Sequence, residues 1–194
     1  APDRSSSPAK DSRVSAIVEF GSLGTALVSS RMPTFVVPYR LNGKSRLGAP
    51  EIARAMLDDV CAACEPLGEV VVCDAPGGQG QALAAVLEDL SGPVVIVNAD
   101  VPCVRTDELE ALAAAAPALV AAPDGTTNAL SLIDARDFVP LYGAGSAARY
   151  VATLGARALD LAGLRDDVDT WDDLVRVGER AGPGTRRQLK ARAA

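Results

Sequence analysis

A run of four β-branched residues, 94–97, lies between Pro93 and a turn, Asn-Ala-Asp-Val-Pro, that ends at Pro102. A short apolar run of this kind is typical of a strand buried on both faces, as in the middle of a parallel sheet. Ligands of open α/β sheets bind outside the carboxyl ends of the strands, so Asp100 is expected at the mouth of a site. From this segment alone, a plain loop or capping aspartate is an equally good interpretation.

The composition favours one α/β domain. The chain has 194 residues, of which 48% are hydrophobic and only 4% aromatic, so the core must be built from Ala, Val and Leu. The net charge of −6 argues against a general nucleic-acid or anionic membrane surface. No apolar run reaches the length of a membrane span, and no secretion signal is recognised.

The chain contains no histidine, which excludes Ser-His-Asp and Cys-His catalysis and mixed Cys/His zinc sites. Chemistry must therefore use carboxylates, Lys, Arg and hydroxyls, with or without a hard metal. The pair Cys61 and Cys64 has redox-motif spacing, but it falls late in an expected helix, so packing is the preferred interpretation. Free thiols in an acidic α/β chain indicate a reducing cytoplasm.

Strands and helices are expected to alternate along the chain. Residues 1–31 are interpreted as a flexible extension before Met32, although residues 14–20 are also compatible with a strand, and 32–194 as a single domain. Strands are expected at 35–37, 69–73, 94–97, 119–122 and 128–133, and helices at 51–64, 81–90, 106–117, 146–154 and from 170. Thr106 and Ser146 are expected to cap their helices, and Thr170 with Asp173 to form a capping box. The short turn between the last two strands requires an antiparallel pair and hence a mixed sheet.

In addition to Asp100, three segments contain residues that could bind substrate or metal. The loop after the first strand gathers three cations, Arg40, Lys44 and Arg46, which suit a triphosphate, although a solvated turn remains an alternative. Gly78 and Gln81 belong to a glycine-rich turn that either binds a nucleotide base or simply connects a strand to a helix.

Asp167 and Asp169 are two residues apart in an expected extended segment. Because side chains alternate along such a segment, both are expected to point to the same side. With Asp100 they form a candidate Mg²⁺ site, since Mg²⁺ prefers oxygen ligands. Helix capping would explain one of these aspartates but not both.

The chain resembles the CofC/FbiD family, the guanylyltransferases of coenzyme F420 biosynthesis. The matching segments follow the family order: Lys44-Ser45-Arg46-Leu47, Asp100-Val101-Pro102, Asp124-Gly125-Thr126-Thr127-Asn128-Ala129-Leu130, Tyr142-Gly143-Ala144-Gly145-Ser146, Asp167-Val168-Asp169-Thr170 and Gly182-Pro183-Gly184-Thr185-Arg186. The resemblance covers residues 34–186. It implies a three-layer α/β/α nucleotidyltransferase fold, GT-A-like and Rossmann-like, with a mixed central sheet.

The resemblance also implies an activity and a set of site residues. The expected reaction joins GMP from GTP to a small phosphorylated three-carbon acid, which is phosphoenolpyruvate, 2-phospho-L-lactate or a phosphoglycerate. Asp100, Asp167 and Asp169 match the metal ligands of the family, Asn128, Gly143 and Ser146 match its phospho-acid positions, and Lys44 with Arg46 match its basic triphosphate loop. Lys44, Arg46 and Asp100 are thus the expected catalytic residues, and Mg²⁺ is the expected cofactor.

Three features depart from the family pattern, and one of them is the extension before Met32, which has no family counterpart. Arg40 stands where the family usually has a lysine, and we expect it to substitute in nucleotide binding. Gly80-Gln81 replaces the usual Leu-Asn, so base contacts from Gly78 and Gln81 are less well supported. Two alternatives stay open: a sugar-1-phosphate or molybdopterin-type nucleotidyltransferase, and a nucleotide-binding regulator without catalysis. Homo-oligomerisation also stays open.

Overall fold

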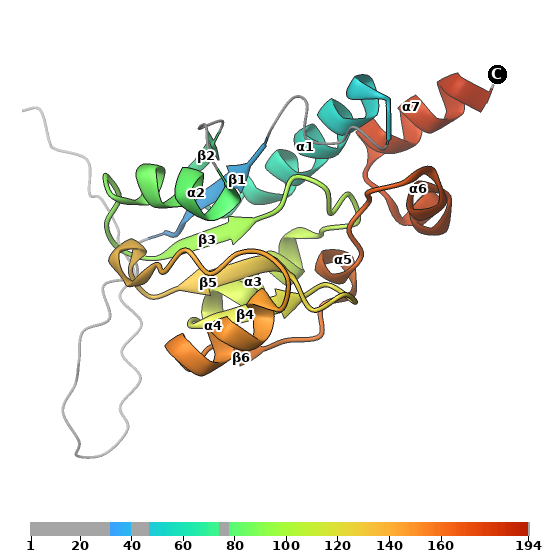
Figure 1. The fold of residues 1–194 in the computed structure, drawn as a ribbon. Coiled ribbons are helices and arrows are strands. Elements are labelled where there is room, and N and C mark those ends of the chain that lie inside the picture. Colours follow the sequence, from blue (N-terminus) through green and yellow to red (C-terminus); the bar gives the residue numbers. More distant parts are fainter. Residues whose placement is uncertain (1–31, 40–46, 74–77, 194) are drawn as a thin grey trace, which may run out of the picture. The chain divides into compact units, whose positions relative to one another are not determined.

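The structure is a computed structural model that describes residues 32–39, 47–73 and 78–193. These residues belong to one compact unit, 31–194 (Figure 1). Its strands are β1 (Thr34–Pro38), β2 (Val70–Cys73), β3 (Val94–Val97), β4 (Ala118–Ala121), β5 (Thr127–Leu132) and β6 (Arg157–Ala158). Its helices are α1 (Pro50–Cys64), α2 (Gln79–Leu87), α3 (Thr106–Ala114), α4 (Ser146–Leu154), α5 (Ala162–Arg165), α6 (Trp171–Val177) and α7 (Pro183–Ala193), with short 3-10 turns at Ala135–Asp137 and Gly178–Arg180.

In the described part of the chain the strands form one six-stranded sheet in the order β2-β1-β3-β5-β4-β6. β1 pairs in parallel with both β2 and β3, whereas β5 runs antiparallel to β3 and β4. The predicted antiparallel pair and mixed sheet are confirmed. The run 94–97 is buried along its whole length at the centre of the sheet, as its β-branched composition indicates.

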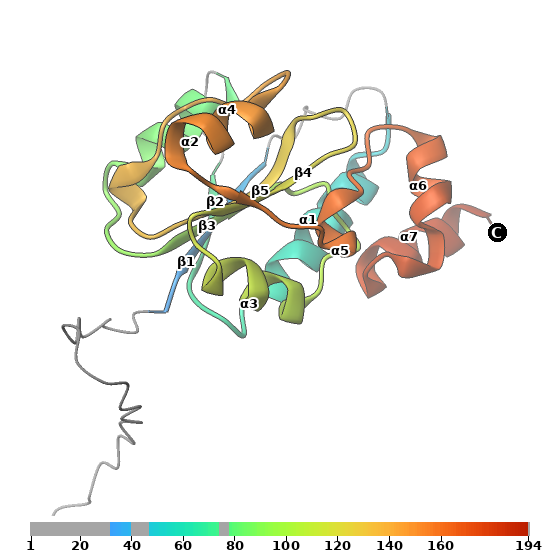
Figure 2. The same ribbon diagram turned by 90° about the horizontal axis from the view of Figure 1, so that it is seen from below.

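Helices cover both faces of the sheet because alternate residues of each strand point to opposite sides. On β1, Phe35 and Val37 pack in one cluster with residues of α1 and α3, whereas Val36 packs in another with residues of α2 and α4. Figure 2 shows α2 and α4 on one side of the sheet and α1 and α3 on the other. The predicted three-layer α/β/α architecture is confirmed.

A third hydrophobic cluster joins α1 to the C-terminal helices. It contains Ile52 and Met56 of α1, Leu174 and Val177 of α6, and Val168 from the segment before α6. Val168 is fully buried there, so the segment that carries Asp167 and Asp169 is fixed against the body of the domain.

α1 also holds the start of α7. The carboxylate of Asp59 accepts hydrogen bonds from the backbone amides of Gly184 and Thr185, both at 2.8 Å. These amides are in the first turn of α7 and lack partners within the helix, so Asp59 acts as its N-terminal cap from another helix. A side chain on Gly182 would meet the carboxylate at 2.3 Å, which explains glycine at that position.

Several helix boundaries differ from the sequence predictions. The hydroxyl of Thr106 does not cap α3, because it donates to the carbonyl of Ala63 at 3.0 Å and Arg105 occupies the cap position. Ser146 is the first residue of α4 rather than its cap, which is Gly145 at φ +68°. The helix that starts after Thr170 ends at Val177, and a separate helix, α7, follows it. The hydroxyls of Thr106 and Ser146 instead bond to distant segments, at Ala63 and Thr127, which a local sequence pattern does not reveal.

The four cysteines are free thiols. Burial and the neighbouring Cys61 and Glu65 raise the pKa of Cys64 to about 12, so it stays protonated at neutral pH. This agrees with the packing interpretation, because a redox pair needs an accessible thiolate. None of the helices in the described residues is long and apolar enough to cross a membrane.

Candidate functional site

The candidate site lies at one edge of the sheet. β1, β2 and β3 all end there, and β5 begins there because it runs antiparallel to β3. The turn with Asp100 follows β3 directly, and Asn128 lies at the start of β5, where its carbonyl accepts from the amide of Asn98 at 2.9 Å. Two segments that sequence reasoning singled out separately, 100–102 and 124–130, are therefore brought together by strand pairing.

Side-chain amides connect this edge from α2 to the segment before α6. Gln79 Nε2 donates to Asn98 Oδ1 at 2.7 Å, and Asn98 Nδ2 donates to the Thr127 carbonyl at 3.2 Å and to Asn128 Oδ1 at 3.5 Å. Asn128 Nδ2 then donates to the Arg165 carbonyl at 2.9 Å. We call Gln79, Asn98 and Asn128 the amide chain.

The amide chain gives Asn128 a structural role. Asn128 is only 1% exposed, and both its side-chain nitrogen and its side-chain oxygen already have protein partners. Asn98 was missed at the sequence level, and Gln79 was recognised only as part of the glycine-rich turn that could bind a base. In the sequence, Asn98 could have been identified as a candidate because it is a polar residue directly after a buried apolar run.

A glycine-rich turn before α4 lies against the start of β5. Ser146 is fully buried, and its hydroxyl is 2.9 Å from that of Thr127. Its backbone amide donates to the Gly143 carbonyl at 3.0 Å. At Ser146 the amide and hydroxyl are thus already bonded within the protein. Gly143 is exposed, with φ +114°, a conformation that favours glycine.

Arg149 of α4 binds the backbone of this turn. Its guanidinium donates to the carbonyls of Ala144 at 2.5 Å and Leu141 at 2.7 Å. The substrate roles predicted for Gly143 and Ser146 stay predictions, but the turn that carries them is fixed in place.

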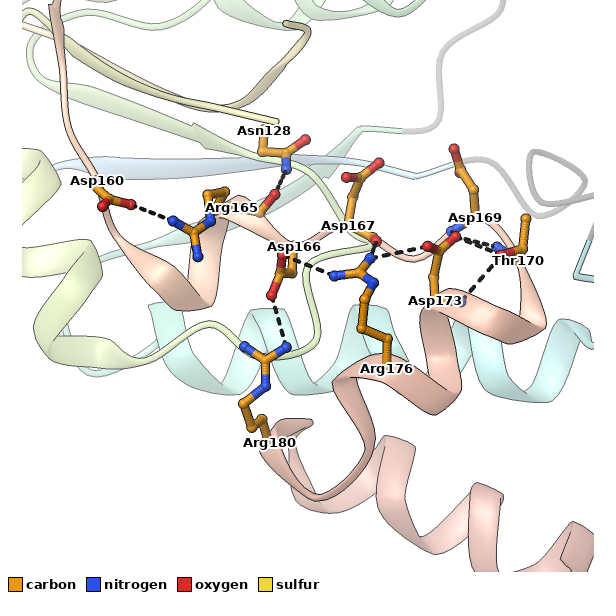
Figure 3. A network of polar contacts seen from close by, with 10 residues as sticks. All are labelled: Asn128, Asp160, Arg165, Asp166, Asp167, Asp169, Thr170, Asp173, Arg176 and Arg180. Atoms are coloured by element: carbon orange, nitrogen blue, oxygen red, sulfur yellow. Dashed lines mark hydrogen bonds and ion pairs between the residues drawn. The ribbon is translucent and has the colours of Figure 1, made fainter. Parts of the chain in front are cut away.

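The segment with Asp167 and Asp169 runs beside the Asp100 turn. The amide of Val168 donates to the carbonyl of Asp100 at 2.9 Å. Figure 3 shows the Asp167 and Asp169 carboxylates pointing to one side of the segment and Asp166 pointing to the other. The alternation predicted from the sequence is therefore present, and both segments of the predicted metal site are adjacent.

On the opposite side of the segment, charged residues form the network drawn in Figure 3. Asp166 contacts Arg176 at 3.0 Å and Arg180 at 2.8 Å, and Arg176 also contacts Asp173 at 3.0 Å. We call Asp166, Asp173, Arg176 and Arg180 the charged network. Burial raises the pKa of Asp166, but its contacts with Arg180 and Arg176 outweigh burial and hold that pKa below its ordinary value.

Capping of α6 is provided by Thr170 and Asp173. The Thr170 hydroxyl accepts from the Asp173 amide at 3.2 Å, and Asp173 Oδ2 accepts from the Thr170 amide at 3.0 Å, so the predicted capping box is confirmed. Asp173 Oδ2 also accepts from the amide of Asp169 at 3.2 Å. The capping box thus accounts for the helix start without using the side chains of Asp167 and Asp169.

The remaining predicted site residues are only partly described. Arg40, Lys44 and Arg46 lie outside the described residues. Gly78 precedes α2, and its amide donates weakly to Gln81 Oε1 at 3.4 Å. Both residues are exposed at the sheet edge, next to the amide chain at Gln79. Their predicted contact with a base stays a prediction.

The predicted Mg²⁺ site has suitable donors. Asp100, Asp167 and Asp169 supply carboxylate oxygens, the ligand type that Mg²⁺ prefers, on two segments joined by the Val168–Asp100 bond. Among the residues that the structure describes, no three His, Cys, Asp or Glu side chains already stand together as a ligand set. The donor chemistry fits Mg²⁺, and its binding stays a prediction.

Comparison with known proteins places this chain among its relatives. No protein-family model matches it. The phosphoenolpyruvate guanylyltransferase of Streptomyces scabiei is 37% identical in an alignment that covers 78% of this chain and 93% of the relative. The chain belongs to the family of phosphoenolpyruvate and 2-phospho-L-lactate guanylyltransferases.

Other members of this guanylyltransferase family differ in how much of their length is matched. The 2-phospho-L-lactate guanylyltransferase of Methanosphaerula palustris is 31% identical over 74% of this chain and 82% of its own length. The phosphoenolpyruvate guanylyltransferase of Nocardia farcinica is 41% identical, but the match covers 50% of this chain and about half, 46%, of the relative.

Among solved structures, a crystal structure of a homolog of Mycobacterium tuberculosis rv0371c, from Mycobacterium sp. strain JC1, has a TM-score of 0.49 and 19% identity, covering 75% of this chain and 94% of that chain.

Proposed function

We propose that this protein transfers GMP from GTP to a small phosphorylated three-carbon acid, with release of diphosphate, in coenzyme F420 biosynthesis. The observation that carries the proposal is the membership of the guanylyltransferase family, together with carboxylates on two adjacent segments at the carboxyl edge of the sheet. Phosphoenolpyruvate is the first acid to test, because the relative with 37% identity is named for it and the relative with 31% for 2-phospho-L-lactate.

The proposed reaction needs no histidine. A phosphate oxygen of the acid attacks the α-phosphorus of GTP, a new P–O–P linkage forms, and the bond to the β-phosphate breaks to release diphosphate. The nucleophile is already ionised at neutral pH and diphosphate is a good leaving group, so no general base is required. The main barrier is the repulsion between two polyanions, which cations must offset.

In this proposal Asp100, Asp167 and Asp169 hold Mg²⁺. When bound, the ion supplies positive charge next to the reacting phosphates. Arg40, Lys44 and Arg46 are proposed to bind the triphosphate, and Gly78 and Gln81 the base. Gly143, Ser146 and Asn128 are proposed to lie around the acid. The free thiols support a reducing compartment, so we propose a cytoplasmic location.

The test is a substrate panel. Purified protein with Mg²⁺ is supplied with GTP or ATP and with phosphoenolpyruvate, 2-phospho-L-lactate or 3-phosphoglycerate, and diphosphate release is measured alongside the nucleotide product by mass spectrometry. We expect diphosphate and a GMP-acid product with GTP and one of these acids. Without an acid, no diphosphate should appear. GTP binding without release in every combination would instead indicate a non-catalytic regulator.

A further inference from the structure

The segment 166–169 has an inner and an outer side. Val168 is fully buried in the cluster between α1 and α6, and Asp166 is 8% exposed on the same side. Asp167 and Asp169 point the opposite way in Figure 3. Because side chains of an extended segment alternate, the orientation of the inner pair fixes that of the outer pair.

Asp166 is the main polar anchor of the inner side. Among the residues that the structure describes, it is the one buried carboxylate. Its two oxygens contact different guanidinium groups, Oδ1 with Arg176 at 3.0 Å and Oδ2 with Arg180 at 2.8 Å. Arg176 Nη2 also donates to the backbone carbonyl of Asp167 at 3.4 Å. The arginines thus hold the segment by a side chain and by its backbone.

Backbone contacts alone do not set which way the outer carboxylates point. The Arg165 carbonyl is held by Asn128 and the Val168 amide by Asp100, one on each side of the Asp166–Asp167 pair. Between these two points the contact of Asp166 with two arginines opposes rotation of the segment. A buried carboxylate with charged partners is costly to disturb, because removing one partner leaves the others without compensation.

We propose that Asp166 is a positioning residue: by engaging Arg176 and Arg180, it keeps Asp167 and Asp169 directed to the outer side of the segment, where they bind the divalent cation of the reaction. The proposal rests on the proposed function and deepens it. Groups that orient metal ligands without contacting the metal typically contribute 10–100-fold to metal affinity. Asp166 itself does not contact substrate or metal.

The test measures cation binding rather than turnover. In the full chain without substrates, Mn²⁺ titration by electron paramagnetic resonance gives the affinity, and circular dichroism gives the melting curve. We expect Asp166→Asn, which keeps the shape but removes the charge, to weaken Mn²⁺ binding about tenfold while the protein remains folded. Asp166→Glu, which keeps the charge, should recover part of the affinity.

The control removes a carboxylate from an exposed arginine contact on α1, outside the charged network. Asp58 accepts from Arg54 at 2.9 Å on α1, and its side chain is 56% exposed. Asp58→Asn should leave Mn²⁺ affinity at the wild-type value. An equal loss in both variants would mean that only net charge matters, and it would overturn the proposal.

A second variant keeps the test decisive should Asp166→Asn fail to fold. Arg180 has a half-exposed side chain, so Arg180→Gln removes one contact of Asp166 without opening the core. A loss of Mn²⁺ affinity of about threefold or more in this variant supports the proposal. Wild-type affinity in a folded variant of either kind overturns it and reduces Asp166 to a structural ion pair.

The diphosphate assay separates this inference from the proposed function. If wild type binds Mn²⁺, Asp166→Asn loses that binding, and no acid yields diphosphate, then the positioning role stands and the proposed reaction falls. If wild type releases diphosphate while Asp166→Asn binds Mn²⁺ normally, the reaction stands and the positioning role falls.

Discussion

The amide chain and the charged network hold two sides of the same sheet edge by different means. The amide chain uses neutral groups whose hydrogen bonds are partly or fully buried, from Gln79 through Asn98 to Asn128. The charged network uses two aspartates and two half-exposed arginines. Neither titrates near neutral pH, because the pKa values of Asp166 and Asp173 are lowered, but the second loses its carboxylate charges in acid and is weakened by salt. The end of β3 and the segment before α6 are therefore held by different chemistry.

The largest expected effect is at Asp100, where the two sides meet. Asp100→Asn keeps the shape and removes one negative ligand of the proposed Mg²⁺ site. Since the electrostatic stabilisation at risk is several kcal/mol, turnover should fall by roughly two to four orders of magnitude. Steady-state rates at saturating Mg²⁺ give the answer. Turnover close to wild type would contradict the metal-site assignment.

The next largest effect should come from breaking the amide chain at its centre. Asn98→Ala removes the groups that contact Gln79, Thr127 and Asn128, and unsatisfied buried polar groups cost about 1–3 kcal/mol. We expect a loss of unfolding free energy in this range that does not change with salt, measured by urea denaturation. Gln79→Ala, which removes one contact, is the matched control and should lose less. A strong salt dependence of the Asn98→Ala effect would remove the distinction between the two sides.

A smaller effect is expected for the hydroxyl contact between Ser146 and Thr127. Ser146→Ala should cost about 1 kcal/mol of stability through the lost hydrogen bond. It should also raise KM for the phospho-acid with little change in KM for GTP, if the substrate role of Ser146 is correct. Thr127→Val removes the same hydrogen bond from the other side. Stability losses alike in both variants, with no change in either KM, would leave Ser146 only a packing role.

The smallest effect concerns the pH response of the charged network. Hydrogen bonding from Thr170, opposed by burial and supported by Arg176, lowers the pKa of Asp173 from 3.8 to about 2. A lowered carboxyl pKa adds stability above pH 3.8, and this stability is lost as pH falls towards about 2. The stability difference between wild type and Asp173→Asn should therefore shrink across this interval in melting experiments. A stability difference that stays constant from neutral pH to pH 2 would contradict the lowered pKa of Asp173.

The fold was more predictable than the site because its signals are local. The buried strand 94–97, proline at the start of α1 and the Thr170–Asp173 capping box each follow from neighbouring residues, and all are present. The caps predicted at Thr106 and Ser146 were wrong, because their hydroxyls bond to Ala63 and Thr127, which no local pattern identifies. Asn98, Asp166 and Arg176 were missed for the same reason: their partners come from other elements.

The cap that Asp59 places on α7 ties together parts of the chain that are made at different times. The carboxylate and the first amide that it binds are separated by 125 residues. While the chain emerges from the ribosome, α1 therefore exposes Asp59 to water until that whole interval has been synthesised. The contact closes one of the longest loops in the domain, and such contacts form late because loop closure costs entropy. Docking of α7 should thus be a late folding event, detectable as late amide protection at Gly184 and Thr185 in pulsed hydrogen exchange.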